Sequence, residues 1–223
     1  MKFGEFAQTV QEYEKDGWFA DRVYLDTMEE LGSVQGDVSK LTVECSRNVI
    51  RMFLVQWGSM ARVVNQKSVS WEKITQSILD VRESFGILSE KGISDMDHVT
   101  GTYKDAIIAA YSALYPSVKA TATSKILRAL NPKLFVIWDA RIRSIEWDGL
   151  RLGDDAESYS RFLNWVGKQM KEVKDERGAD TEKELVDEIV KGMNVDDHVK
   201  ELCQRKSLAK LADEYCWWKA WKQ

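Results

Sequence analysis

Apolar residues recur at three- and four-residue spacing along most of the chain, and strand-like alternation is scarce. Only two prolines, Pro116 and Pro132, interrupt this pattern. The sequence therefore predicts an all-α protein. Helices are expected, to within several residues at each end, at 5–15, 21–31, 37–57, 70–85, 102–114, 120–130, 139–147, 155–175, 181–191, 195–203 and 206–221.

Residues 37–57 begin with Asp37, a suitable N-cap residue, and present a broad apolar face, so they predict one long core helix. Pro116 is expected to end the helix that begins near residue 102. The charged region 168–201 predicts solvated helices joined around Gly178. We expect a single domain, 1–223, in which an amino-terminal lobe (1–100) and carboxy-terminal helices (155–223) pack on either side of a core at 102–147.

The stretch TSKILRALNPKLFVIWDARIRS, residues 123–144, contains an apolar run that ends abruptly in a carboxylate, Asp139. The run from Leu134 to Trp138 is too short for another full helix, so we expect an extended or single-turn connection through the core. Asp139 then stands at the head of the next helix, where an N-cap contributes roughly 1 kcal/mol. A carboxylate at the end of a buried run otherwise needs a compensating partner, or a use, because burying an unpaired charge is costly.

Composition is ordinary for a globular protein, with 223 residues, 44% hydrophobic and 30% charged. No run approaches eighteen apolar residues and the first residues include acids, so we expect a cytoplasmic, monomeric protein without membrane segments. The three cysteines show no paired spacing and the two histidines lie far apart in sequence. Neither a disulfide framework nor a metal site is predicted, and no cofactor is implied.

Charge is distributed unevenly along the chain. The formal net charge is −4, yet the segment from Lys119 to Arg143 holds six basic residues and one acid, Asp139. A basic island on an acidic body favours a localised anionic ligand such as a phosphate backbone, although a solvated surface face gives the same pattern. If the helices around the apolar run form a hairpin, Lys125 and Asp139 can face one cleft, either as a structural ion pair or as reacting groups.

The segment TSKILRALNPKLFVIWDARI resembles the Lys-to-Asp segment of the helix-hairpin-helix DNA glycosylase superfamily, in particular its 8-oxoguanine glycosylase branch. The resemblance covers about 25 residues strongly and implies a two-lobed helical fold that binds double-stranded DNA and flips out a base. By position, Lys125 matches the family's lysine nucleophile and Asp139 its catalytic aspartate, while Arg141 lies where the family contacts the extruded nucleotide.

The sequence departs from the family in two ways. The Lys-to-Asp interval is several residues shorter, and YPSVKATATSK contains no glycine where the family has a glycine-rich hairpin. Phosphate contacts would then come from side chains and helix amides. The predicted DNA-binding residues are Lys119, Thr121, Thr123, Ser124, Arg128, Arg141 and Arg143. The predicted base-pocket residues are Gln56, Trp57, Met60, Trp138, Trp217, Trp218 and Trp221, for each of which core packing is the competing interpretation.

A shorter form of the fold without the hairpin is similar to glycosylase-like proteins of bacterial antiphage defence. This resemblance implies excision of α-glucosyl-hydroxymethylcytosine from phage DNA in the bacterial cytosol. A fixed carboxylate near C1′ suits this chemistry, because cleavage of the glycosidic bond builds positive charge on the sugar. Three alternatives stay open: a repair glycosylase for oxidised guanine, a DNA-binding protein without catalysis, and a helical regulator that docks through its acidic helices at 172–201.

Overall fold

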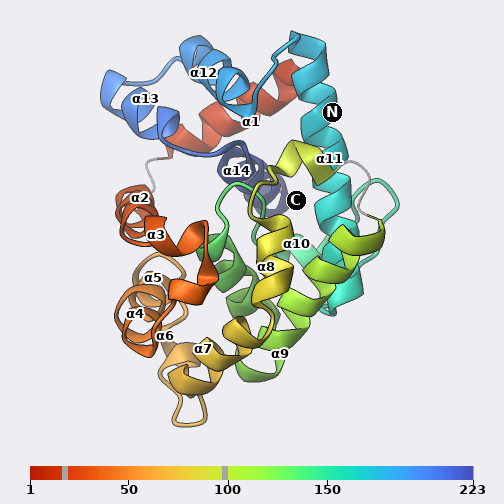
Figure 1. Cartoon of the computed structure of the whole chain (residues 1–223). Helices are drawn as coiled ribbons and strands as arrows, with labels where there is room; N and C mark the ends of the chain where they lie inside the picture. Colours follow the sequence, from red (N-terminus) through yellow and green to blue (C-terminus); the bar gives the residue numbers. More distant parts are fainter. Residues whose placement is uncertain (17–19, 97–99, 223) are drawn as a thin grey trace.

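The computed structural model describes residues 1–16, 20–96 and 100–222, and 74% of the protein is helical. Within these described ranges there is no β-strand, and an isolated bridge between Trp147 and Leu150 is the nearest approach to one. The predicted all-α class is confirmed (Figure 1).

The α-helices of the described residues, in chain order, are α1 (Phe3–Lys15), α2 (Ala20–Glu30), α3 (Gly32–Gln35), α4 (Val43–Cys45), α5 (Arg51–Gln56), α6 (Ala61–Val64), α7 (Trp71–Asp80), α8 (Arg82–Leu88), α9 (Gly101–Leu130), α10 (Ala140–Ser144), α11 (Ala156–Arg177), α12 (Glu182–Gly192), α13 (Asp197–Gln204) and α14 (Leu208–Lys222). Two short 3₁₀ turns, η1 (Val38–Lys40) and η3 (Ile93–Met96), and one π-helical turn, η2 (Ser46–Ile50), connect or extend them.

Local capping chemistry explains where several helices begin and end. The Ser70 hydroxyl accepts a hydrogen bond from the Lys73 amide at the start of α7, and Asp155 does the same for Ser158 at the start of α11. Thr181 and Glu184 form a capping box at α12. Gly178 ends α11 with a φ of 65°, which confirms the predicted junction there.

The predicted long helix at 37–57 is wrong at its amino-terminal end. Asp37 caps only the 3₁₀ turn η1, and the chain is extended at Leu41 before Thr42 caps a new helix through the Cys45 amide. From there α4, η2 and α5 run on as one helical segment with a π turn in the middle. The predicted helix is therefore correct for residues 43–56, and residues 37–42 precede the helical segment.

Pro116 does not end the helix that precedes it. It lies inside α9, and the helical path breaks three residues later at Lys119, whose backbone has φ 63° and ψ 173°. This region of backbone space is almost restricted to glycine because Cβ meets the backbone there. α9 is thus two helical halves, 101–118 and 120–130, joined at one strained residue, whereas the sequence predicted separate helices at 102–114 and 120–130.

Figure 1 shows the helices in two groups. At the top, α1 lies with α12, α13 and the carboxy-terminal end of α11, above α14, and it packs directly on α14 and α11; the rest of α11 runs down beside α9. The other group contains α2 to α8 together with α9. The amino-terminal lobe expected at 1–100 is therefore not continuous in sequence, because its first helix belongs with the carboxy-terminal helices.

The apolar residues of both groups form one continuous core, in which Phe135 and Trp138 are completely buried. The connection between α9 and α10 passes through this core. Across the described residues, no helix combines the length and the apolar character needed to cross a membrane.

Candidate functional site

The buried connection that leads to Asp139 begins with a turn at 132–134 and has no regular secondary structure from there to Asp139. Residues 134–138 are all buried, so their backbone polar groups need partners from elsewhere in the protein. Arg128 Nη1 donates to the Phe135 carbonyl at 2.6 Å, and the Tyr159 hydroxyl donates to the Val136 carbonyl at 2.8 Å. The Ile137 amide donates to Asp213 Oδ1 at 3.3 Å.

Both backbone polar groups of Trp138, the amide and the carbonyl, are hydrogen-bonded to side chains. Its amide donates to Ser124 Oγ at 3.0 Å, and its carbonyl accepts from Arg143 Nη1. Side chains from α9, α10, α11 and α14 therefore hold four consecutive residues of the connection. This network determines where the chain leaves the core, and hence where the next residue, Asp139, lies.

Asp139 is the N-cap of α10, as the sequence predicted. Its Oδ1 accepts a hydrogen bond from the Ile142 amide at 2.8 Å, and the residue is half-buried. Among the described residues no hydrogen bond to Oδ2 is present. The cap therefore uses one oxygen of the carboxylate.

Lys125 lies in the second half of α9, half-buried beside the end of α5. Its Nζ donates to the Gly58 carbonyl at 2.7 Å and lies 5.7 Å from the centre of the Trp57 ring. Burial lowers the pKa of Lys125, while the negative charges of Asp139 and Asp213 oppose that shift. No direct ion pair joins Lys125 and Asp139 in the described part of the chain, so the two interact through space.

A cleft of about 590 Å³ opens where the middle of α9 meets α10 and the segment around α6. It brings together four residues that the sequence predicted for DNA or base contact, Met60, Lys119, Thr121 and Arg143. Lys73 adds a further cation, and Asp154 is the acid among the lining residues. The cleft is therefore mainly basic and has the character of an anion site.

Lys119 occupies the break in α9 at the wall of this cleft. Its side chain is exposed, with Nζ 5.2 Å from the centre of the Tyr115 ring. The half-helix that follows begins at residue 120, and Ala120 and Thr121 also line the cleft. The first turn of that half-helix thus faces the same space as the Lys119 and Arg143 side chains.

A second surface feature extends from α10 to the end of α14. The Arg141 guanidinium lies 4.0 Å from the centre of the Trp221 ring, and Trp221 is 53% exposed. The Trp217 ring stacks on Trp221 with centroids 5.2 Å apart and planes 10° apart. We call Arg141, Trp217 and Trp221 the aromatic platform.

Five of the predicted contact residues are corrected by their burial. Arg128 and Ser124 are completely buried and hold the connection, so they do not reach DNA. Thr123 is also completely buried. Trp138 packs in the core against Tyr159 and Phe162. Trp218 is 6% exposed and its Nε1 donates to Glu12, so it joins α14 to α1.

The remaining predicted base-pocket residues differ in exposure. Gln56 is exposed at the end of α5. Trp57 is half-buried, stacks on Phe53 with centroids 4.8 Å apart, and has the Nζ atoms of both Lys125 and Lys210 at 5.7 Å from its ring centre. Its ring therefore lies beside the Lys125 ammonium.

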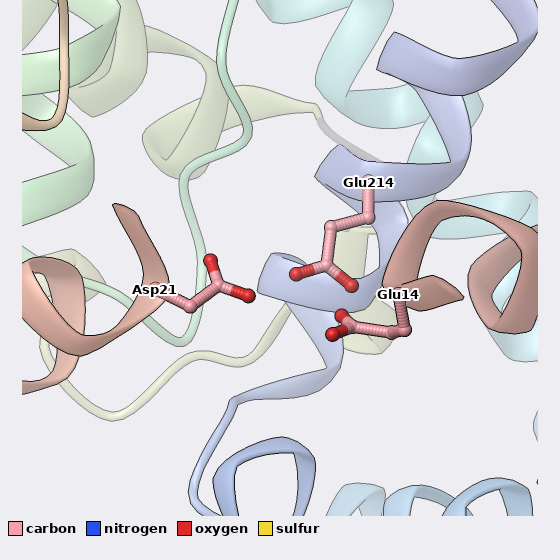
Figure 2. A group of neighbouring side chains, drawn as sticks. All are labelled: Glu14, Asp21 and Glu214. Atoms are coloured by element: carbon pink, nitrogen blue, oxygen red, sulfur yellow. The ribbon is translucent and has the colours of Figure 1, made fainter. Parts of the chain in front are cut away.

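Sequence reasoning missed a buried cluster of charges. Figure 2 shows the carboxylates of Glu14, Asp21 and Glu214 pointing toward one another from α1, α2 and α14. Lys206 Nζ lies 2.5 Å from oxygens of Glu14 and Asp21 and 2.9 Å from Glu214. Lys210 Nζ lies 2.5 Å from the same Glu214 oxygen and 3.3 Å from Asp21.

The Lys206 ammonium occupies the position that a metal ion would take among these three carboxylates, so the cluster is an ion-pair network. Burial raises the pKa of Glu14 to about 8, with a further contribution from the charge of Glu214. Glu14 is therefore mainly protonated at neutral pH. Two ammonium groups then face two carboxylates, and the buried network is balanced in charge.

Comparison of the chain with protein-family models, with curated proteins and with solved structures found no match.

Proposed function

We propose that this protein is a DNA glycosylase that flips out a modified base and hydrolyses its glycosidic bond. The observation that supports this proposal best is the rigid placement of Asp139. Hydrogen bonds from side chains hold the four residues that precede it. The Ile142 amide donates to one of its oxygens, and Arg143, one helical turn further along, lines the basic cleft. A carboxylate fixed in this way can stabilise developing positive charge without moving.

Asp139 would act on the sugar of the extruded nucleotide. As the bond from C1′ to the base breaks, positive charge grows on the sugar and the free Asp139 oxygen stabilises it. The same oxygen can orient the attacking water. The departing base takes up a proton, and the product is an abasic site.

The basic cleft would hold the phosphate backbone next to that nucleotide. Lys119 and Arg143 supply charge, Thr121 supplies a hydroxyl, and the first turn of the half-helix after Lys119 supplies amides. The strained backbone at Lys119 supports this role, because such outliers persist where the surrounding structure and the function require them.

The aromatic platform would contact the bases on the other side of Asp139. Trp221 is exposed enough to stack on a base, and Arg141 and Trp217 hold its ring in place. Base stacking of this kind tolerates different sequences. The platform therefore contributes affinity, and recognition of the modified base is left to the cleft and the neighbourhood of Trp57.

Lys125 would assist the carboxylate. Its Nζ is held by the Gly58 carbonyl, so in this conformation it acts as a fixed positive charge beside Asp139. Burial lowers its pKa, which is the direction that a lysine nucleophile requires. A weak strand-cleaving lyase activity through a Schiff base is consistent with that placement.

For the substrate we propose α-glucosyl-hydroxymethylcytosine in phage DNA, with the protein acting as a monomer in the bacterial cytosol. This finer proposal rests on the resemblance of residues 123–144 to the antiphage glycosylase-like proteins. Oxidised guanine is the competing substrate within the same reaction class.

The test is to incubate the purified protein with glucosylated phage DNA, with DNA containing 8-oxoguanine and with unmodified DNA, and to label abasic sites with an aldehyde-reactive probe. Abasic sites on one modified DNA, reduced at least about 100-fold in Asp139→Asn, would support the proposal and identify the substrate. Asn still caps a helix, so the variant should fold.

A second candidate, a DNA-binding protein without catalysis, is favoured by the helix cap at Asp139, because that cap alone explains the residue. It predicts salt-sensitive DNA binding with no abasic sites on any of the three substrates. Absence of both binding and abasic sites would contradict a role on DNA altogether.

A further inference from the structure

A pocket separate from the basic cleft lies between the two groups of helices. Its volume is about 490 Å³, and it is lined by residues of α2, α3 and α12, by the segment before α14 and by the start of the connection after α9. Figure 1 shows α2 and α3 below α12 and α13 on this side of the protein. The pocket shares no lining residue with the basic cleft. Its volume is typical of a small-molecule site.

The floor of this pocket is apolar. Its buried apolar lining residues are Tyr24, Leu25, Val186 and Leu208, and none of them is more than 4% exposed. The half-buried side chain of Met28 adds further apolar surface. A ligand of this pocket therefore needs an apolar body, because removal of apolar surface from water stabilises binding.

The walls of the pocket are held in place by hydrogen bonds. The Ser207 hydroxyl donates to the Pro132 carbonyl at 2.5 Å, and the Tyr24 hydroxyl accepts from Arg128 Nη2 at 2.9 Å. The same guanidinium donates to the Phe135 carbonyl. The pocket is therefore preformed, and a ligand can bind without first ordering the side chains around it.

The mouth of the pocket is positively charged. Lys133, Lys183 and Arg205 line the pocket and are exposed. Lys183 and Arg205 are paired with Asp187 and Glu29, but these pairs lie at the surface, where ion pairs contribute little to stability and can exchange partners. The Lys133 ammonium has no ion pair or hydrogen bond with any residue of the described ranges. It is therefore available to an anionic group of a ligand.

The other two charged lining residues do not change the sign of the mouth. Glu182 is half-buried, and its Oε1 accepts the Ser94 amide at 2.7 Å, so its charge is used at η3. The Lys206 ammonium is held inside the ion-pair network. An apolar floor with exposed cations at its mouth is complementary to an aliphatic chain that ends in a carboxylate.

We propose that this pocket binds a small aliphatic carboxylate, with the chain on the floor formed by Leu25, Val186 and Leu208 and the carboxylate at the mouth beside Lys133. Binding involves no covalent step. The inference does not depend on the proposed function, because none of the residues assigned to DNA binding or to the catalytic pair lines this pocket.

The test is isothermal titration calorimetry of the full chain with three probes. Octanoate has both the chain and the carboxylate, octanol keeps the chain without the charge, and acetate keeps the charge without the long chain. We expect saturable binding of one octanoate per protein, and affinity at least about tenfold lower for octanol and for acetate, because each lacks one complementary part. No saturable octanoate binding, or equal affinity for octanoate and octanol, would overturn the proposal.

Methionine methyl groups report where octanoate binds. Met28 lines the pocket, whereas Met60 lines the basic cleft, which could also attract an anion. In protein labelled with ¹³C at methionine Cε, octanoate should shift the Met28 signal, and each signal is identified by its absence in the corresponding Met→Leu variant. A shift at Met60 without a shift at Met28 would locate octanoate in the basic cleft and contradict the inference.

Lys133→Gln tests the role of the charge. Lys133 is exposed, so the variant should fold. We expect octanoate affinity to fall about threefold or more while octanol affinity is unchanged, because only the charged contact is lost. Lys191→Gln is the matched control, since it removes an exposed lysine that lines a different pocket beside α1, and both affinities should then be unchanged. Unchanged octanoate affinity in Lys133→Gln would overturn the proposed contact with the carboxylate.

Discussion

Arg128 donates a hydrogen bond from Nη1 to the carbonyl oxygen of Phe135 at 2.6 Å, in the completely buried centre of the protein. Its Nη2 donates to the Tyr24 hydroxyl at 2.9 Å. A guanidinium therefore joins α2, α9 and the connection that leads to Asp139. Counted along the sequence, Arg128 is one of six cations in a basic island, but its charge is used inside the protein.

Replacement of Arg128 by Met should therefore destabilise the protein strongly. Met keeps much of the side-chain volume but leaves the Phe135 carbonyl and the Tyr24 hydroxyl without the donor that they share. We expect the free energy of unfolding, measured by urea denaturation, to fall by about 3–5 kcal/mol. Arg141→Met is the matched control, because Arg141 is exposed, and it should change stability by less than about 0.5 kcal/mol. Similar stability in both variants would contradict a structural role for Arg128.

Lys119→Gly should make the protein more stable and a weaker DNA binder. Glycine adopts φ 63° and ψ 173° without the strain that a side chain causes, and this gain exceeds the entropy that glycine adds to the unfolded chain. We expect about 1 kcal/mol of additional stability in urea denaturation. Loss of the cation should lower the slope of log affinity against log salt by about 1.

The control for this variant is Lys73→Ala, which removes another cation of the same cleft from the regular helix α7. It should weaken DNA binding similarly while stability stays within about 0.5 kcal/mol. A loss of stability in Lys119→Gly would show that the Lys119 side chain contributes packing that outweighs its backbone strain.

The parts of the fold that the sequence predicted are those determined locally. Apolar spacing located the helices, and the Asp139 cap depends on residues only three positions apart. The break in α9 could not be predicted, because nothing in KATATSK distinguishes a strained lysine from a helical one. Pro116 was misleading for a similar reason, since a proline near the end of a helix can be accommodated when tertiary packing compensates.

The buried charges were missed because their partners are distant in sequence. Lys206 is paired with Glu14 and Asp21, which precede it by 192 and 185 residues. Lys206, Lys210 and Glu214 recur at four-residue spacing, a pattern that is also typical of a solvated helix face. The available signal was that this stripe lies in a segment whose other positions are mostly apolar or aromatic, which leaves little room for a polar face.

Glu14→Gln should change stability in a manner that depends on pH. The folded-state pKa of Glu14, about 8, lies above the ordinary value of 4.5, so between these values the folded protein binds the additional proton. The stabilisation that protonated Glu14 contributes to the folded state is therefore fully present below about pH 4.5. It decreases as pH rises and is lost once pH exceeds about 8. Gln imitates the protonated form and should remove the decline.

The measurement is the difference in unfolding free energy between Glu14→Gln and the unaltered protein from pH 5 to 9, so that other titrating groups cancel. We expect a small difference near pH 5 and a growing advantage for the variant as pH increases. Asp21→Asn is the contrasting control: burial raises the Asp21 pKa, but the stronger effect of Lys210 and Lys206 leaves it lowered, so its charge is required. That variant should lose about 3 kcal/mol at pH 7. Equal losses in both variants would mean that Glu14 is ionised.

Of the three tryptophans of α14, Trp218 should stabilise the fold and Trp221 should bind DNA. Trp218 is 6% exposed and its Nε1 donates to Glu12 at 3.1 Å, whereas Trp221 is 53% exposed and contacts Arg141 and Trp217. Trp218→Ala should therefore cost about 3–5 kcal/mol of stability. Trp221→Ala should cost less than about 1 kcal/mol, because its ring already contacts water.

For DNA affinity, the order of the two tryptophans is the reverse of their order for stability. We expect Trp221→Ala to weaken binding by about 1–3 kcal/mol, the contribution of one base stacked on an aromatic ring, with no change in salt dependence because no charge is removed. Trp221→Phe should recover part of the loss, since a smaller ring still stacks. Fluorescence anisotropy with a labelled duplex at several salt concentrations measures both quantities. Unchanged affinity in Trp221→Ala would place the aromatic platform outside the DNA-binding surface, and the basic cleft around Lys119 and Arg143 would then have to account for binding alone.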